Sequence, residues 1–585
     1  MDGNEDVNFL ELSAEAIDNM SLEKTPILNE RQCKNLLCHF QKCLKVFQEY
    51  GSPYIDGFGP IWKEFFFIAS KAKMVVDSCT NDDWHQEALL QNANKETFRE
   101  MLLDLEDCVN TIFDNFQNHQ LITPEKMREL KRCTSFLPAE ISEVEEDQIS
   151  LCERLVSDVK TLPIDSNNFK LAKYLLEMME CSRKVEGGEL DNIKFPLNLP
   201  CPTFGDLPKP LGQTGLGGVM VYGTEWLGVR TATKTIDLDV VSTKDPLEKE
   251  ASILAGLNHP NIIKFFYCGM KDITHLLFGM EKGEKNLSKL LFDKGKNITY
   301  NAKLNIMLQL ASGMCYLHDM RVAHRDLKPA NVIVSSVHVP RLDGDGFVIA
   351  KLVDFGISKI KVKSDSELPT YGATFGTLGY IAPEAIIKKG DSVVEVDAFK
   401  ADVFSFGVMC YVILTQCISP FQELRKREEL LKALNDRNLK HLMPNDIMPE
   451  LYMLIEQCWS SDPSKRPLFP SIHQRLKYIH KKSLEASIRC EVSNSFDINS
   501  SKNARGCMAK SSSIFMHLKE WLKVLHAIFI FFEYLTRWWK YVNTSRSKEP
   551  SILVNAHVQV RVLFMMYLKI HIDCMIEWYS FRIQK

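Results

Sequence analysis

The sequence predicts a multidomain protein whose amino-terminal part is an all-α helical bundle. At 585 residues the chain is too long for one ordinary core, so two or more domains are expected. Residues 31–183 show helical periodicity throughout, and the glycine- and proline-containing stretch 184–203 is interpreted as a linker. The second domain, residues 204–482, includes buried strand-like runs such as 276–278.

The helical prediction for residues 31–183 rests on apolar stripes at intervals of three and four residues. Ser52-Pro53 and Thr123-Pro124 are interpreted as helix starts or breaks. Several amphipathic helices in succession predict an antiparallel bundle, which we interpret as a regulatory domain. The two clearest stripes are Leu36, Leu37, Phe40, Leu44 and Phe47, and Phe98, Leu102, Leu105, Val109, Ile112 and Phe116.

The two ends of the chain have their own composition. Residues 1–30 carry scattered apolar residues and many acids and are predicted to be poorly ordered, while 483–513 includes a Ser/Asn/Lys-rich stretch and is interpreted as a linker. The tail, 514–585, is hydrophobic and amphipathic. Within 514–542 the polar residues form one helical stripe, and no uninterrupted apolar run approaches the roughly 20 residues needed to span a bilayer.

This tail is therefore not expected to cross a membrane. Peripheral contact of 514–542 with a membrane surface is one interpretation. Docking on a partner, packing on the protein itself and a mis-predicted terminal exon without an evolved role are the others, and all of them stay open.

Composition and charge narrow the function classes. A net charge of −4 argues against nucleic acid as the main partner. The 17 cysteines include no CxxC pair and no zinc-type spacing, which predicts mostly buried, reduced thiols. The acidic first residues, 1–6, carry neither a signal peptide nor a myristoylation motif. We therefore expect a cytoplasmic protein, with membrane association left open.

The most informative motif is HRDLKPAN at residues 324–331, followed by DFG at 354–356. Phosphoryl transfer needs charge neutralisation on the triphosphate, an oriented hydroxyl and exclusion of water. The two motifs contain an aspartate, a lysine and oxygen-bearing side chains that can bind a metal, all within residues 324–356. These residues resemble the catalytic loop and the metal loop of eukaryotic protein kinases.

The resemblance implies a bilobal α+β protein-kinase fold over residues 204–482, with ATP and Mg²⁺ as cofactors. It also implies roles for the polar residues. Asp326 would orient or deprotonate the substrate hydroxyl, and Lys328 would neutralise the γ-phosphate. Asn331 and Asp354 would hold Mg²⁺.

Residues 212–219 resemble the glycine-rich loop that covers the nucleotide in this family. Gly212, Gly215 and Gly217 would let the backbone lie close to the phosphates, and Val219 would cover the adenine. The sequence departs from the family pattern at Thr214, where the second glycine is usual. The branched side chain of Thr214 is expected to crowd the phosphates and reduce turnover, although Gly215 restores some freedom.

The resemblance extends to the strands that frame the nucleotide. Lys234 takes the place of the strand lysine that contacts the α- and β-phosphates, with Ala232 beside it at the adenine. Glu250 is the expected ion-pair partner of Lys234. By this alignment Met280 is the gatekeeper, and Glu281 begins the segment that contacts adenine through backbone groups.

Two further residues support the same fold. Asp402 would anchor the catalytic loop from a buried helix, and Arg466 would pair with Glu384. The interval between Asn331 and Asp354 is about ten residues longer than usual, which predicts a lengthened surface hairpin. Residues 357–384 resemble an activation segment, and a phosphate on this segment would pair with the arginine that precedes the catalytic aspartate.

Lys328-Pro329 together with Gly376-Thr377 is the combination seen in serine/threonine kinases. The segment from Cys458 to Pro467 looks like that of the tyrosine-kinase-like group. The bundle loosely resembles the helical amino-terminal domains of plant mixed-lineage-like kinases, through Cys43-Leu44 and residues 62–92; a generic helical regulatory domain is the alternative.

The sequence thus predicts a serine/threonine protein kinase of intracellular signalling that transfers the γ-phosphate of ATP to protein hydroxyls. Its expected partners are protein substrates bearing Ser or Thr and a regulatory protein that binds the helical domain. The alternative is an ATP-binding switch or scaffold with weak catalysis, whose bundle acts at a membrane or on a partner. Thr214 favours the alternative, and the intact catalytic loop opposes it.

Overall fold

The computed structural model divides into two compact units, Met1–Ser495 and Phe496–Lys585. The features discussed below lie in the first unit, apart from the last residues of the helix that ends at Asn503. Residues 514–585, with their predicted amphipathic segment, lie outside the described residues. The structure describes residues 8–20, 25–51, 58–91, 95–118, 122–133, 141–186, 210–214, 219–237, 257–270, 275–293, 298–337, 348–354, 379–386, 396–424, 426–435, 443–444 and 447–503.

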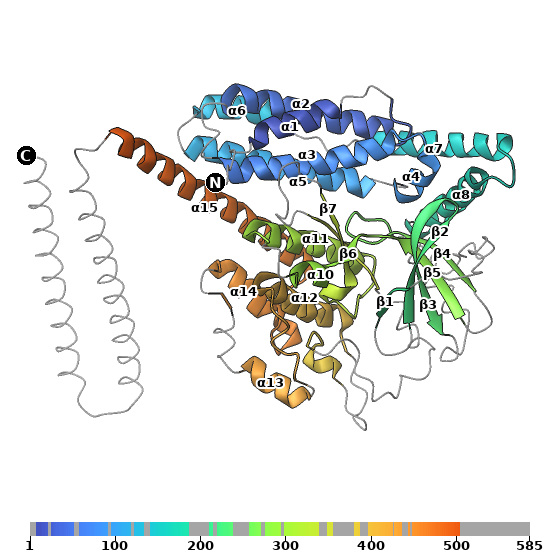
Figure 1. Cartoon of the computed structure of the whole chain (residues 1–585). Helices are drawn as coiled ribbons and strands as arrows, with labels where there is room; N and C mark the ends of the chain where they lie inside the picture. Colours follow the sequence, from blue (N-terminus) through green and yellow to red (C-terminus); the bar gives the residue numbers. More distant parts are fainter. Residues whose placement is uncertain are drawn as a thin grey trace, which may run out of the picture. The chain divides into compact units, whose positions relative to one another are not determined.

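The amino-terminal region is an all-α bundle, as predicted (Figure 1). Its core is aromatic: the ring of Phe47 lies 5.3 Å from Trp62, 5.0 Å from Phe65 and 6.2 Å from Phe113, measured between centroids. The apolar sides of neighbouring helices face one another in the bundle, because each helix buries one side. The helices are α1 (Phe9–Asn19), α2 (Glu30–Gly51), α3 (Gly59–Cys79), α4 (Trp84–Gln91), α5 (Lys95–Asn118), α6 (Pro124–Cys133), α7 (Ile141–Thr161) and α8 (Asn167–Glu186).

Helix α1 corrects one prediction, because it lies within the segment 1–30 that was expected to be poorly ordered. The side chain of Asn8 caps it by accepting hydrogen bonds from the backbone N–H groups of Leu10 and Glu11. Leu10 and Ile17, seven residues apart, lie on one face and are buried. The helix packs against α3, so burial of this short stripe orders a segment whose composition is otherwise polar.

The second domain has two lobes (Figure 1). Its amino-terminal lobe is an antiparallel sheet in the order β1-β2-β3-β5-β4. In the register of β3 and β5, Ala232 pairs with Met280 and Lys234 pairs with Phe278. The strands are β1 (Pro210–Thr214), β2 (Val219–Trp226), β3 (Val229–Asp237), β4 (Phe265–Met270) and β5 (His275–Glu281).

The carboxy-terminal lobe is mainly helical and carries a small sheet of order β6-β7-β8. Strands β7 and β8 pair antiparallel and flank the hairpin predicted to be long, whose residues 338–347 lie outside the described part. The elements are α10 (Leu287–Leu291), α11 (Tyr300–Asp319), α12 (Ala398–Thr415), α13 (Arg427–Asn435), α14 (Pro449–Cys458), α15 (Phe469–Asn503), β6 (Lys285–Asn286), β7 (Val332–Ser336) and β8 (Val348–Leu352).

Helix α12 is the centre of this lobe, since it is buried without interruption from Asp402 to Leu414. Among the described helices it alone is long and apolar enough to span a membrane, but 72% of that window is buried inside the protein. A helix that is apolar all round and covered on all sides is a core helix.

Helix α15 corrects a predicted boundary. It runs through residue 482 to Asn503, whereas a linker was predicted from 483. The helix contains no glycine after Phe469 and its proline lies in the first turn, so nothing in its sequence breaks it. The Ser- and Asn-rich composition indicated the end of the domain but not the end of the helix.

The bundle contacts both lobes of the second domain. On the amino-terminal lobe, the ring of Tyr174 in α8 lies 5.1 Å from that of Trp226, and its hydroxyl donates a hydrogen bond to the carbonyl of Phe266. On the carboxy-terminal lobe, Phe67 of α3 packs with Val337 at the base of the β7–β8 hairpin. The bundle therefore packs against both lobes of the second domain.

Candidate active site

The loop that carries HRD is anchored by Asp402 of α12, as predicted. One carboxylate oxygen of Asp402 accepts the backbone N–H of His324 at 2.8 Å, and the other accepts that of Arg325 at 2.7 Å. The first oxygen also lies 3.0 Å from Nε2 of His318, a partner that the sequence alone did not reveal. Arg325 has φ +68°, an uncommon backbone conformation for a residue with a side chain. The buried carboxylate fixes that conformation.

His324 contributes a neutral ring to this anchor. Burial lowers the pKa of His324, against the opposing effect of the nearby carboxylates of Asp402 and Asp326. The ring is therefore neutral at pH 7. Its Nδ1 accepts the backbone N–H of Asp326 at 3.4 Å, which assigns the remaining ring proton to Nε2.

Lys328 and Asn331 meet at the carboxylate of Asp326. The amine of Lys328 donates to Oδ2 of Asp326 at 2.8 Å. The side-chain amide of Asn331 donates to the same oxygen at 2.9 Å and to the main-chain carbonyl of Asp326 at 2.8 Å. Two donors on one oxygen hold the carboxylate in a single orientation.

Lys234 and Asp354 form the second cluster. The lysine lies on β3 and the aspartate follows β8, and their Nζ and Oδ1 atoms are 2.7 Å apart. The two side chains are only 5% and 16% exposed, so each charge depends on the other for compensation. The backbone N–H of Val353 donates to the carbonyl of Asn331 at 3.0 Å, which brings the two predicted metal ligands together. Glu250, the predicted partner of Lys234, lies outside the described residues.

The hinge side of the site contains Met280 and Glu281. Met280 pairs with Ala232, which puts the predicted gatekeeper on the same sheet face as the adenine position. The backbone N–H of Glu281 donates to the carbonyl of Lys264 at 2.8 Å, so a backbone contact of this residue with adenine has to use its carbonyl. Its carboxylate accepts from Lys351 of β8 at 2.6 and 2.7 Å, a pair that sequence reasoning missed.

The predicted glycine-rich loop is described only at its base. Gly212 lies in β1 opposite Val221, and Thr214 pairs with Val219 where β1 and β2 meet. Gly215 and Gly217 lie outside the described residues. The structure describes only the backbone of Thr214 and Val219, so crowding of the phosphates by Thr214 stays a prediction.

A buried ion pair between Arg466 and Glu384 lies in the same lobe as the catalytic loop. Nη2 of Arg466 donates to Oε2 of Glu384 at 2.9 Å, and the arginine side chain is fully buried. This confirms the predicted pairing. Of the predicted activation segment, 357–384, residues 357–378 lie outside the described residues.

Comparison with known proteins identifies the family. Residues 209–476 match the family model for protein tyrosine and serine/threonine kinases. The tyrosine-protein kinase SRK3 of Spongilla lacustris is 30% identical over 285 residues, which cover 48% of this chain and 78% of that protein. This chain belongs to the protein kinase family. The bilobal second domain is accordingly a protein kinase domain, and the helical bundle precedes it.

Two other relatives are much longer than the region that they share with this chain. A light-sensor protein kinase of Ceratodon purpureus is 27% identical over 514 residues, covering 80% of this chain and 38% of that protein. The probable serine/threonine-protein kinase qkgA of Dictyostelium discoideum is 32% identical over 245 residues, covering 41% of this chain and 15% of that protein. This chain thus spans well under half the length of these two relatives.

One solved structure shares the arrangement of both domains. The AtMLKL3 tetramer structure matches with a TM-score of 0.61 at 19% identity, covering 82% of this chain and 90% of that chain. The helical bundle followed by a kinase domain is therefore a known fold. This agrees with the resemblance of the bundle to the helical domains of plant mixed-lineage-like kinases.

The residues present fit ATP with Mg²⁺, which the kinase fold implies. Magnesium prefers oxygen ligands and is commonly held by one or two carboxylates together with substrate phosphates. The carboxylate of Asp354 and the amide oxygen of Asn331 would form such a set, and the amines of Lys234 and Lys328 pair with Asp354 and Asp326. When bound, Mg²⁺ neutralises charge on the phosphates.

Proposed function

We propose that this kinase phosphorylates serine and threonine side chains of proteins in intracellular signalling. The observation that carries the proposal is the pair of charge clusters, Asp326 with Lys328 and Asn331, and Lys234 with Asp354. A catalytic site that had lost its activity would have no reason to keep both clusters hydrogen-bonded and largely shielded from water.

Asp326 and Lys328 act directly on the substrate hydroxyl and on the phosphoryl group that is transferred. The carboxylate of Asp326 orients the substrate hydroxyl and accepts its proton. Lys328, held at 2.8 Å from the same carboxylate, neutralises charge on the phosphoryl group during transfer. Lys234 and Asp354 position the triphosphate and its metal.

Specificity for serine and threonine is supported by Lys328-Pro329 directly after the catalytic Asp326-Leu327. This is the combination seen in serine/threonine kinases. The relatives above carry both serine/threonine and tyrosine names, so the hydroxyl specificity of this chain rests on its own catalytic loop.

We further propose that the helical bundle regulates the kinase domain and binds a regulatory protein. The bundle contacts the amino-terminal lobe through Tyr174 and the carboxy-terminal lobe through Phe67. Because kinases close and open around their substrates, a domain attached to both lobes is placed to control that motion. The cytoplasm is the proposed compartment, and 514–542 the proposed segment for peripheral membrane contact.

The alternative is an ATP-binding switch with weak catalysis, in which the bundle carries the output. Thr214 is the observation that favours it, since a branched side chain stands where the family has glycine. In that case ATP binding would survive while transfer would be close to background.

One experiment separates the two functions. The full chain is incubated with radiolabelled ATP, Mg²⁺ and a generic protein substrate, while ATP affinity is measured on the same sample. Asp326→Asn is the control, because it keeps the side-chain shape and removes the proton acceptor. Transfer to serine and threonine well above this control supports the kinase. ATP binding with transfer equal to the control would favour the switch, and transfer to tyrosine would overturn the specificity.

A further inference from the structure

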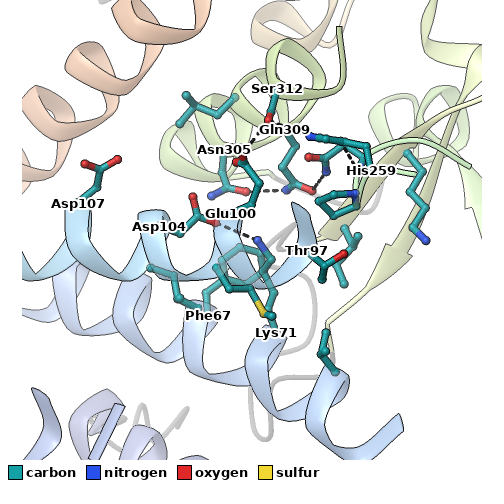
Figure 2. A pocket seen from close by; sticks show the side chains of 18 of the residues that line it. Phe67, Lys71, Thr97, Glu100, Asp104, Asp107, His259, Asn305, Gln309 and Ser312 are labelled. Atoms are coloured by element: carbon teal, nitrogen blue, oxygen red, sulfur yellow. Dashed lines mark hydrogen bonds and ion pairs between the residues drawn. The ribbon is translucent and has the colours of Figure 1, made fainter. Parts of the chain in front are cut away.

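A cavity of about 610 Å³ lies between the bundle and the kinase domain. Helices α3 and α5 line it from the bundle, and α11, α15 and β8 line it from the kinase domain (Figure 2). The bundle contributes carboxylates, among them Glu64 and Glu100, while α15 contributes Lys477 and Lys481. The cavity between the two domains is therefore lined by charged side chains of both signs.

Glu64 of α3 is the most buried of these carboxylates, with 6% of its surface exposed. Its Oε1 accepts a hydrogen bond from the side-chain amide of Asn305 on α11 at 3.3 Å, and its Oε2 lies 3.8 Å from Nε2 of His480 on α15. Burial raises the pKa of Glu64. A carboxylate in this position costs free energy unless its hydrogen bonds are made, so the contact with Asn305 specifies one docked position.

A relay of side-chain amides leads from Glu64 into the kinase domain. The Oδ1 atom of Asn305 accepts from Nε2 of Gln309 at 2.7 Å. The same Nε2 donates to the carbonyl of Val348 at 2.8 Å, and Oε1 of Gln309 accepts the backbone N–H of Ala350 at 2.8 Å. Figure 2 shows Asn305 and Gln309 side by side and linked in this cavity.

The relay has one hydrogen-bonding polarity. Gln309 uses both of its donors and both of its acceptor positions, because Oε1 also accepts from Nδ2 of Asn261 at 3.2 Å. When the oxygen of Asn305 points toward Gln309, its NH₂ group points the other way and needs an acceptor there. Glu64, from the bundle, provides that acceptor.

Strand β8 connects the relay to the metal site. It holds Val348 and Ala350, ends at Leu352 and is followed by Asp354. The backbone N–H of Leu352 donates to the carbonyl of Asn261 at 2.8 Å, so the same asparagine that meets Gln309 also fixes the end of the strand. A shift of β8 would therefore move the predicted Mg²⁺ ligand.

We propose that Glu64 is a positioning residue through which the docked bundle holds β8, and with it Asp354, in place for Mg²⁺ binding. This rests on the proposed regulation by the bundle and names the contact that carries it. When the bundle undocks from the kinase domain, Asn305 loses its acceptor and its side-chain amide can flip. Gln309 then loses a partner, and β8 loses part of the support of its backbone.

The test compares variants of the full chain. Glu64→Ala removes the acceptor, and Glu64→Gln keeps an acceptor oxygen while removing the charge. Asp114→Ala is the matched control, because it removes a bundle carboxylate that docks on Lys481 of α15 at 2.6 Å but lies off the relay. Asn305→Ala removes the next member of the relay from the kinase side.

Two readouts are independent of phosphoryl transfer. The first is the gain in ATP affinity on adding Mg²⁺, measured by calorimetry. Glu64→Ala is expected to reduce this gain between about twofold and thirtyfold, the range known for residues that couple distant sites. The second is amide hydrogen exchange of β8 without nucleotide, which should become faster in Glu64→Ala. Glu64→Gln should restore most of both.

The outcomes distinguish the proposal from its alternatives. Effects of Glu64→Ala and Asn305→Ala that do not add in the double variant would support the relay. The proposal is overturned if Glu64→Ala behaves as wild type, or if Asp114→Ala reduces the Mg²⁺ effect equally, since that would indicate general undocking. If wild type binds no ATP, the proposed kinase function fails, while the exchange of β8 still decides whether the relay exists.

Discussion

The amine of Lys234 lies 2.7 Å from the carboxylate of Asp354, and this ion pair joins the two lobes of the kinase domain. Lys234 comes from the sheet of the amino-terminal lobe, whereas Asp354 follows β8 of the carboxy-terminal lobe. The residues proposed to hold the phosphates and the metal are thus already assembled across the cleft.

Replacing Lys234 should abolish most transfer. Lys234→Met removes a buried positive charge proposed to stabilise the phosphates, and kcat/KM is expected to fall about 10²- to 10³-fold. Steady-state kinetics with a protein substrate measures this, with the exposed Lys289→Met as a control that should keep wild-type rates. A loss below about threefold for Lys234→Met would show that the amine takes no part in the reaction.

Thr214→Gly should raise turnover. A glycine at the base of the loop removes the branched side chain that is predicted to crowd the phosphates, and relief of about 1.4 kcal/mol would increase kcat about tenfold. Thr214→Ser, which removes only the methyl branch, should give an intermediate rate. Unchanged or slower turnover in both variants would mean that Thr214 is accommodated in the loop.

Tyr174→Ala should loosen the bundle from the amino-terminal lobe. The side chain is 1% exposed and packs edge-on against Trp226, so its removal is expected to cost about 3–5 kcal/mol. Tyr174→Phe keeps the ring and loses the hydrogen bond to Phe266, at about 1 kcal/mol. Thermal unfolding and limited proteolysis measure the difference. Equal behaviour of the two variants would contradict the packing role of the ring.

Acid should destabilise the protein through His259. Burial lowers the pKa of His259 from 6.5 to about 3, with a smaller contribution from His473. As the pH falls below 6.5, the unfolded chain binds a proton that the folded chain cannot, so stability present above pH 6.5 is progressively lost toward pH 3. Between pH 7 and 5 this amounts to about 2 kcal/mol.

Urea unfolding at the two pH values measures that loss. His259→Gln should show a loss smaller by about 2 kcal/mol than wild type, because glutamine does not titrate. Equal pH dependence of the two proteins would mean that His259 is protonated as readily in the folded state as in the unfolded one.

The residues of the catalytic loop could be named from the sequence because the HRDLKPAN motif is local. Asp326, Lys328 and Asn331 lie within six residues, and the structure shows the hydrogen bonds among them. The anchoring role of Asp402 came from the family resemblance and is confirmed by two backbone hydrogen bonds.

Contacts between distant segments could not be predicted in the same way. Lys351 reaches Glu281 from 70 residues away, and Glu64 reaches Asn305 from 241 residues away. Each is an ordinary charged or polar residue in its local sequence, and only the docking of strands and helices gives it a partner. The sequence signal for Glu64 was present but weak: an acid at a buried position of an apolar helix.

The order of segment 1–30 and the boundary at residue 482 were predicted poorly for a related reason. Helix α1 is stabilised by packing on α3, and α15 continues because nothing interrupts it. Local composition indicates polarity, whereas order in these segments depends on what lies beside them.

The most direct test of the kinase assignment is phosphoryl transfer by the full chain compared with Asp354→Asn. Both proteins are assayed with Mg²⁺, ATP and a generic protein substrate. Asparagine keeps the shape of the side chain but removes the charge proposed to bind the metal. Transfer to serine or threonine that falls about 10²-fold or more in the variant is the predicted result. Equal transfer by wild type and Asp354→Asn, at the background level, would contradict it.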